Sequence, residues 1–270
     1  MQALIHPLTE LADYEEIVKN NRKGPGAIRI LGCVNSQKTH MMYGLSDGCR
    51  YKVIICSSES KAKQIYEEYR FLDRSVYLYP AKDLLFYQAD LRSKELVRER
   101  MEVLEAVIEG RPLTVVASFD ALMDSLLPKE IIAGRTIRVS YDGTLELSAM
   151  EKALADLGYE RVVQIEGPGQ FAVRGGILDM FPLTEELPVR IELWGDEVDS
   201  IRTFDVESQR SIENLTEVSI CPSIEFPGEG EQGVSFLDYF PADETLLFLD
   251  EPVRLMEKGQ GVEEEFIEAQ

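Results

Sequence analysis

The sequence holds few of the residues from which metal sites and disulfide frameworks are built. Its 270 residues include two histidines, His6 and His40, and four cysteines. The cysteines, which show no Cys-x-x-Cys spacing, are Cys33, Cys49, Cys56 and Cys221. A zinc site is therefore not expected, and the cysteines are expected to be reduced, buried thiols of a cytoplasmic protein.

Long apolar runs are also absent. No stretch of about 18 or more apolar residues occurs, so no membrane-spanning helix is expected. The first residues lack the basic region, the apolar core and the small-residue cleavage site of a secretory signal. At 270 residues with a 44% apolar share, the chain is long enough for two or three compact units, each with its own core.

Basic residues become scarce along the chain, whose net charge is −21. Residues 1–133 carry 18 basic and 19 acidic side chains, residues 134–209 carry 7 and 15, and residues 210–270 carry 3 and 15. Nucleic-acid binding depends on clustered lysines and arginines that contact phosphates. The last two segments are therefore excluded as surfaces that grip DNA.

The most informative stretch is Gly169–Pro182, which reads as two extended segments that meet at Gly175-Gly176. A Gly-Gly pair supplies the positive φ angles of a tight hairpin turn, although a single strand with a glycine bulge gives a similar pattern. Alternation places Phe171 and Val173 on one face, and Ala172 and Arg174 on the other. The stretch presents an arginine and an aromatic on a short hairpin in an otherwise acidic domain, and it contains no catalytic pattern.

The segment around this stretch predicts a small, mainly β unit at about 134–209. A strand at 136–140 precedes a helix that Ser148 opens with capping-box spacing to Glu151 and that Gly158 ends. The predicted hairpin follows, and then strands at 189–194 and 197–206. Asp196, Glu197 and Asp199 are interpreted as a solvated turn.

The preceding part of the chain alternates strands and helices, which predicts a parallel sheet with helices on its faces. The expected strands are Ala27–Leu31, Tyr51–Cys56, Val76–Tyr79 and Leu113–Ala117. A helix is expected from Ser58 to about Leu72. A second one begins at Ser93, with Val97, Met101, Leu104 and Ile108 on one face.

Two motifs resemble an ATP site. Gly32–Thr39 follows an expected strand and has the form of a P-loop, with Lys38 and Thr39 in place. Gln37 replaces the second glycine, and its side chain obstructs the backbone cradle for the β-phosphate. The second motif is an apolar strand at 246–249 that ends in Asp250 and Glu251, like the Mg²⁺-binding element of such ATPases. A P-loop fold that has lost its chemistry is the favoured interpretation. A functional ATP-binding enzyme domain that uses Lys38, Thr39, Asp250 and Glu251 is the alternative.

A family resemblance rests on three runs. Residues 171–182 read FAVRGGILDMFP, residues 190–202 read RIELWGDEVDSIR, and residues 204–212 read FDVESQRSI. They closely resemble the transcription-repair coupling factors (Mfd), and a looser form occurs in the excision-repair protein UvrB. In both families this region is a domain that docks on UvrA, the damage-recognition ATPase. The aromatic-rich hairpin that UvrB inserts into DNA is short here, at residues 83–92, and lacks the tyrosine cluster.

The resemblance implies an N-terminal UvrB-homology module in three parts. Residues 1–133 would form a degenerate P-loop-like α/β domain, residues 134–209 an inserted UvrA-docking domain, and residues 210–270 a return segment that completes the first sheet and is truncated at its end. The module would recruit UvrA to stalled RNA polymerase and would have no catalytic residues or cofactor of its own. RNA polymerase and DNA would bind only to domains outside these residues.

The resemblance also implies a docking site. The arginine that the F-x-V-R-G motif uses for the UvrA contact corresponds to Arg174, and Phe171 matches the aromatic residue of the motif. Arg161 is included at a less well fixed position. From the residues alone, Arg174 is an ordinary surface arginine paired with Asp179 or Glu192, and Phe171 belongs to the core. A purely structural clamp, in which the middle domain packs only on its own chain, is a further alternative.

Overall fold

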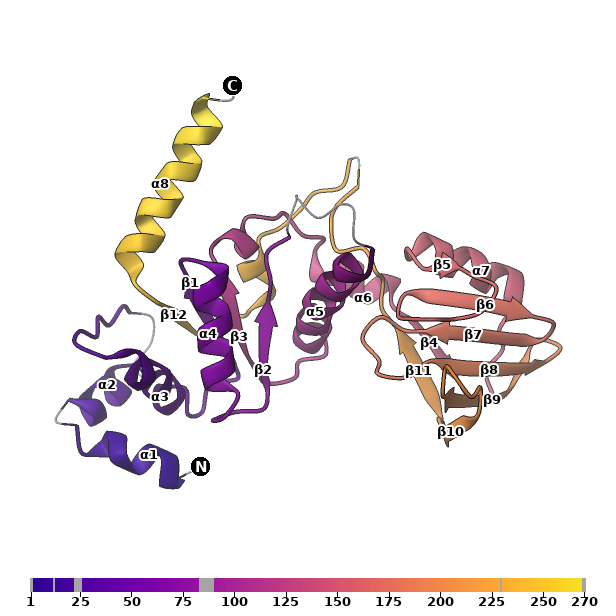
Figure 1. Cartoon of the computed structure of the whole chain (residues 1–270), viewed down its shortest axis with the longest axis horizontal. Coiled ribbons are helices and arrows are strands. Elements are labelled where there is room, and N and C mark those ends of the chain that lie inside the picture. Colours follow the sequence, from indigo (N-terminus) through magenta and orange to yellow (C-terminus); the bar gives the residue numbers. More distant parts are fainter. Residues whose placement is uncertain (1, 12, 22–25, 83–89, 229, 269–270) are drawn as a thin grey trace. The chain divides into compact units, whose positions relative to one another are not determined.

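The computed structural model describes residues 2–11, 13–21, 26–82, 90–228 and 230–268 (Figure 1). Two compact units divide the chain between them. One comprises Met1–Lys82, Glu109–Asp124 and Ser235–Gln270, and the other comprises Asp83–Ile108 and Ser125–Val234. The first is called the α/β unit below and the second the middle unit.

The helices and strands of the α/β unit are α1 (Gln2–Thr9), α2 (Tyr14–Asn21), α3 (Asn35–Leu45), β1 (Tyr51–Cys56), α4 (Glu59–Tyr69), β2 (Val76–Tyr79), β3 (Leu113–Ser118), η2 (Asp120–Leu122), η3 (Phe236–Tyr239), β12 (Thr245–Leu249) and α8 (Pro252–Glu268). Those of the middle unit are α5 (Asp90–Ile108), α6 (Lys129–Arg135), β4 (Ile137–Ser140), α7 (Leu147–Asp156), β5 (Glu160–Arg161), β6 (Gln170–Arg174), β7 (Ile177–Phe181), β8 (Val189–Trp194), β9 (Glu197–Phe204), β10 (Ser211–Asn214) and β11 (Glu217–Ile220).

The α/β unit is built on four parallel strands in the order β12-β1-β3-β2. Apolar strands of this kind are buried by helices that cross over between them. Here α3 and α4 supply part of the cover, since Met42 and Ile65 pack with Ile54 and Val116 in one cluster. The predicted α/β class with a parallel sheet is confirmed, and β12 brings the chain back to that sheet after the middle unit.

One sequence-based expectation needs correction and another lies outside the described part. Ala27–Leu31 is not a strand, and Leu31 is 74% exposed. The short stretch that replaces the UvrB hairpin lies at residues 83–92, and of these 83–89 lie outside the described residues.

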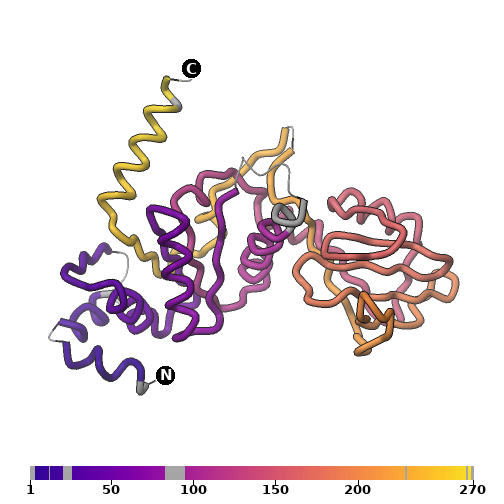
Figure 2. Tube along the Cα trace, in the orientation of Figure 1, coloured from indigo at the N-terminus to yellow at the C-terminus, as the bar shows by residue number. Residues whose placement is uncertain are grey.

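The middle unit contains a six-stranded sheet in the order β10-β9-β8-β7-β6-β5 (Figure 1). The Cα trace runs back and forth through these strands (Figure 2). Strands β6 and β7 pair antiparallel, with Arg174 opposite Ile177 across the Gly175-Gly176 turn. The hairpin is therefore confirmed, and the single bulged strand is wrong. Helix α7 begins after Glu146, whose carboxylate accepts hydrogen bonds from the amides of Ser148 and Ala149. Glu146, rather than Ser148, is thus the N-cap.

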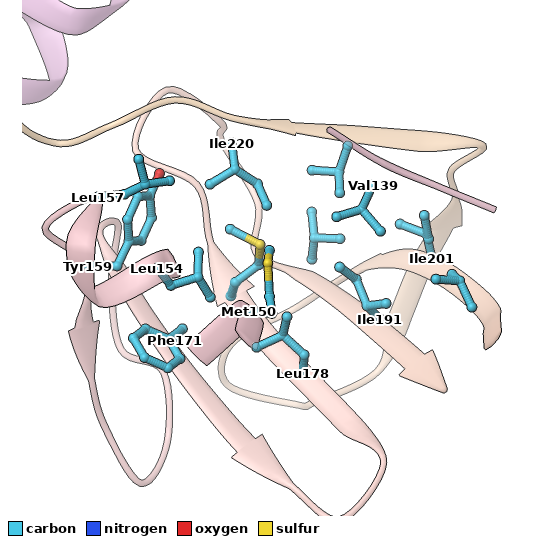
Figure 3. Packing of buried hydrophobic residues seen from close by; sticks show 14 residues of the cluster. Val139, Met150, Leu154, Leu157, Tyr159, Phe171, Leu178, Ile191, Ile201 and Ile220 are labelled. Atoms are coloured by element: carbon cyan, nitrogen blue, oxygen red, sulfur yellow. The ribbon is translucent and has the colours of Figure 1, made fainter. Parts of the chain in front are cut away.

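One face of the six-stranded sheet forms the core of the middle unit (Figure 3). Phe171, Leu178 and Ile191 project from β6, β7 and β8, and Met150 and Leu154 from α7 pack against them. The β4–β11 pair closes this core with Val139 and Ile220. The alternation seen in the sequence decides this arrangement, because every second strand residue points to the buried side.

The division into compact units does not by itself test the predicted domain boundaries. Strand β11 pairs with β4 inside the middle unit, and helix α5 is grouped with the same unit. The limits 1–133, 134–209 and 210–270 stay predictions.

Candidate functional site

The face of the six-stranded sheet opposite α7 carries a group of charged and polar side chains beside a second buried cluster that includes Ala172, Phe181 and Phe204, and we call it the polar face. The strand register brings its residues into two rows across β6, β7, β8 and β9. One row is Ala172, Asp179, Arg190 and Arg202, and the other is Arg174, Ile177, Glu192 and Ser200. Residues directly opposite each other on neighbouring strands lie within contact distance, so the polar face forms a connected network.

Asp179 is the centre of this network. Its side chain is 3% exposed and accepts a bidentate pair of hydrogen bonds from Arg190, with Nε to Oδ1 at 2.6 Å and Nη2 to Oδ2 at 2.8 Å. The hydrogen bond to Asp179 raises the pKa of Arg190. Arg190 also donates to Gln209 at 2.9 Å and lies 4.5 Å from the ring centroid of Phe204. These contacts fix the guanidinium in one geometry.

Arg174 is the exposed branch of the same network. Its Nη2 donates to Asp179 Oδ2 at 2.8 Å, while its side chain is 53% exposed. Of the two partners considered for it, Asp179 is therefore the observed one, and Glu192 instead contacts Arg202 and Ser200. Two arginines share one buried carboxylate, which leaves a local surplus of positive charge at the surface.

The structure places the other two expected docking residues elsewhere. Phe171 is 1% exposed and belongs to the core on the α7 side of the sheet. Its ring is therefore not on the surface, because alternation turns it away from Arg174. Arg161 is exposed and forms an ion pair with Glu151 of α7 at 2.9 Å. Since Arg161 lies beside Phe171 in the parallel β5–β6 pairing, it belongs to the α7 side and not to the polar face.

Asp179 and Arg190 were not singled out as site residues from the sequence. Two-residue alternation already puts Asp179 and Arg174 on one face of a hairpin. The pairing of β8 with β7, which adds Arg190, follows only from the register of the sheet.

The P-loop-like motif has a compact internal arrangement. Lys38 Nζ lies 2.9 Å from Asp250 Oδ1 and 3.6 Å from Glu251 Oε1. The hydrogen bond to Asp250 raises the pKa of Lys38. Thr39 is buried and its hydroxyl donates to Glu68 Oε2 at 2.8 Å. Both residues that would bind phosphate and Mg²⁺ in a P-loop are thus engaged within the protein.

Gln37, which stands where a P-loop has its second glycine, also makes a contact at the start of α3. Its side-chain oxygen accepts a hydrogen bond from the amide of Val34 at 3.3 Å, at the start of α3. Backbone amides at a helix start are the groups that hold a phosphate in a P-loop. One such amide is here bound to Gln37. A surface groove of about 400 Å³ between α3 and α4 includes Thr39, but Lys38 and Asp250 do not line it.

A family model matches part of the middle unit, and relatives match a larger share of the chain. Residues 137–226 match the family model of the UvrB interaction domain. The transcription-repair-coupling factor of Bacillus subtilis (strain 168) is 33% identical over 221 residues, which are 81% of this chain and 19% of that protein. The corresponding factor of Staphylococcus aureus (strain Mu50) is 36% identical over 160 residues, 58% of this chain and 13% of that protein.

These matches define the chain as one that carries a UvrB interaction domain, and this domain contains the polar face. The chain is similar to the transcription-repair coupling factors over most of its length, and the resemblance found in its sequence is confirmed. It spans about a fifth of the length of the B. subtilis relative, at 19%.

Other classes of site receive no support within the described ranges. No helix there is long and apolar enough to cross a membrane, and no group of three or more His, Cys, Asp or Glu side chains is arranged to hold a metal ion. All four cysteines are free thiols. Cys56 and Cys221 are buried as expected, whereas Cys33 and Cys49 are half-buried.

Proposed function

We propose that this chain is a non-catalytic docking module that binds UvrA and recruits it to stalled RNA polymerase. The observation that carries the proposal is Arg174, an exposed arginine held in place by a buried carboxylate on a UvrB interaction domain. Arginine is enriched in the residues that dominate protein interfaces, and a preorganised side chain loses little entropy on binding.

The chemistry of Arg174 indicates what it would contact. A guanidinium has five N–H donors in a fixed fork, and the hydrogen bond described for Arg174 uses its Nη2. The remaining donors are available to a carboxylate or carbonyl oxygen of the partner. Because the negative charge of Asp179 is already shared with Arg190, Arg174 retains its attraction for an acidic group.

The roles of the other two residues follow from their positions. Phe171 supports the docking surface from below as part of the core and is not proposed as a direct contact. Arg161 lies on an edge strand, where a partner that wraps around the sheet edge can reach it. Arg161 is therefore proposed as a peripheral contact, weaker than Arg174.

We also propose that the ATP-site motif, Gly32 with Lys38, Thr39, Asp250 and Glu251, is vestigial. Lys38 is bound to Asp250, Thr39 to Glu68, and Gln37 blocks an amide of α3. Calorimetric titration with Mg²⁺-ATP tests the point. We expect no heat of binding, and tight binding that Lys38→Ala abolishes would instead support an ATP-binding enzyme domain.

The remaining parts of the proposed function concern the longer family protein. Binding of RNA polymerase and ATP-driven movement on DNA are assigned to domains outside these residues. The cytoplasmic location and the domain boundaries also stay predictions.

The test is the affinity of the whole chain for purified UvrA, measured for the wild type and for Arg174→Ala. We expect the variant to lose about 1–2 kcal/mol of binding free energy, as expected of an arginine near the energetic centre of an interface. Arg138→Ala is the matched control, because Arg138 is an exposed arginine on β4 and should leave the affinity unchanged. Absence of wild-type binding would refute the docking function and favour the structural clamp.

A further inference from the structure

The chain has one tryptophan, and it is exposed. Trp194 ends strand β8 with 83% of its surface accessible to solvent. Tryptophan is usually well buried, and it is among the residues most enriched in the energetic centre of protein interfaces. Its exposure therefore needs a physical reason.

Alternation along β8 places Trp194 on the polar face. Ile191 points into the core and Leu193 packs against it, so Glu192 and Trp194 point the other way. The register irregularity at this point does not disturb the alternation of β8. Glu192 faces Ser200 and Leu193 faces Val198, so the additional residue, Asp199, lies on β9.

The same register brings Trp194 close to Arg174. Arg174 lies opposite Ile177, and Ile177 lies opposite Glu192, two residues before Trp194. With strands about 4.8 Å apart and a rise of about 3.4 Å per residue, the two backbone positions are roughly 12 Å apart. A typical interface of about 800 Å² per partner easily covers both side chains.

The backbone around Trp194 is held on both sides. The amide of Leu193 donates to the carbonyl of Gly176 at 2.8 Å, which joins β8 to the turn next to Arg174. After Trp194 the turn is held by Leu145, whose amide donates to the carbonyl of Asp196 at 2.7 Å. A fixed backbone makes the exposed indole a preorganised contact.

We propose that Trp194 is a second contact residue for UvrA, adjacent to Arg174 on the polar face. This inference rests on the proposed function and specifies the chemistry of the partner surface. UvrA would offer an apolar recess for the indole beside an acidic group for Arg174. Trp194 supplies apolar area that Phe171, buried in the core, does not.

Binding measurements with two substitutions test the proposal. Trp194→Ala should weaken the affinity of the whole chain for UvrA about tenfold or more, and Trp194→Phe should restore part of the loss. Phe71→Ala is the matched control, since Phe71 is 86% exposed in the α/β unit and should not change the affinity. Circular dichroism establishes that each variant is folded.

A direct readout comes from ¹⁹F NMR of the chain labelled with 5-fluorotryptophan, because one tryptophan gives one resonance. The resonance should shift or broaden on addition of unlabelled UvrA, and Arg174→Ala should shift the titration to higher UvrA concentration. An unchanged resonance in the presence of bound UvrA overturns the role of Trp194 while the docking function stands. Loss of self-association in Trp194→Ala with unchanged UvrA affinity overturns it in favour of a contact between copies of the chain. Absence of UvrA binding by the wild type refutes both proposals.

Discussion

At the scale of single residues, Asp179 and Arg174 form an ion pair whose two members contribute differently to stability. Asp179 is buried and bound to two arginines, whereas Arg174 is half exposed. Exposed ion pairs contribute about 0–1 kcal/mol to stability. Removal of one partner of a buried pair leaves the other charge uncompensated and costs more.

This contrast gives the first prediction. Asp179→Ala should lower the free energy of unfolding by about 3 kcal/mol, because Arg190 then keeps a mostly buried charge without its bidentate partner. Arg174→Ala should lower it by less than about 1 kcal/mol. Urea denaturation of both variants measures the difference, and equal losses would show that Asp179 is not the centre of the network.

At the scale of elements, the β6–β7 turn depends on one close approach. A Cβ atom on Gly176 would lie 3.0 Å from the carbonyl oxygen of Leu193. Real Cβ atoms seldom come this close to backbone, so the turn and β8 would have to separate. Gly175 has a φ of +62°, which provides the tight reversal at the preceding position.

Gly176→Ala is therefore expected to destabilise the middle unit by about 1–3 kcal/mol, as overpacking does. It should also weaken UvrA binding, because the turn positions Arg174. Gly167→Ala is the control, since nothing lies within 4 Å of its Cβ position. Thermal unfolding and UvrA affinity are measured for both variants. Equal losses in Gly176→Ala and Gly167→Ala would contradict the expected role of the close approach.

A second element-scale feature joins three segments of the middle unit through Tyr159. Its hydroxyl donates to the carbonyl of Cys221 at 3.0 Å and accepts from the amide of Leu183 at 3.2 Å. Burial raises the pKa of the Cys221 thiol to about 12, and burial also raises the pKa of Tyr159. Both groups are therefore protonated in the folded state at pH values where the unfolded chain ionises them.

The sign of the pH dependence follows. Below pH 9.0, the ordinary value for Cys221, neither group favours unfolding. Above it the unfolded state loses the Cys221 proton that the folded state retains, and above 10.0, the ordinary value for Tyr159, it loses the Tyr159 proton as well. Stability falls by up to about 1.4 kcal/mol per pH unit for each group that has ionised in the unfolded state. Urea denaturation between pH 8 and pH 10.5 should show this fall, and Cys221→Ala should reduce it. Cys33→Ala, a change at a half-buried thiol, is the control, and an unchanged slope in Cys221→Ala would contradict the assignment.

The elements also show what the sequence could predict. Strands β1, β2 and β8 have the predicted bounds, because their apolar residues and alternation are local signals. The same alternation predicts that Phe171 and Arg174 lie on different faces of β6. The structure agrees with this prediction, and Phe171 is therefore buried instead of lying on the surface. The apolar run at 27–31 reads equally well as a strand, but strand formation needs a pairing partner that local sequence does not reveal. The Asp179–Arg190 contact depends on register between separate strands.

At the scale of the whole molecule, the charge distribution makes residues 134–270 better suited to bind a protein than to bind DNA. The net charge is −21, and residues 134–270 together hold 10 basic and 30 acidic side chains. The arginines of the polar face lie within this acidic surrounding and are engaged with Asp179 and Glu192. Arg174, the exposed arginine of the polar face, suits one specific carboxylate on a protein partner. A duplex instead requires several cations along its phosphates.

The last prediction follows from this arrangement. Titration of a fluorescent DNA duplex with the whole chain should give no change in anisotropy up to about 10 μM protein at low salt, because few phosphates can be neutralised. UvrA, the damage-recognition ATPase, serves as the positive control under the same conditions. Adding this chain to UvrA should then increase the anisotropy further through a ternary complex, and Arg174→Ala should reduce that increase. Binding of the chain alone, weakening steeply with added salt, would show a phosphate-binding surface and contradict the interpretation of a module that recognises protein only.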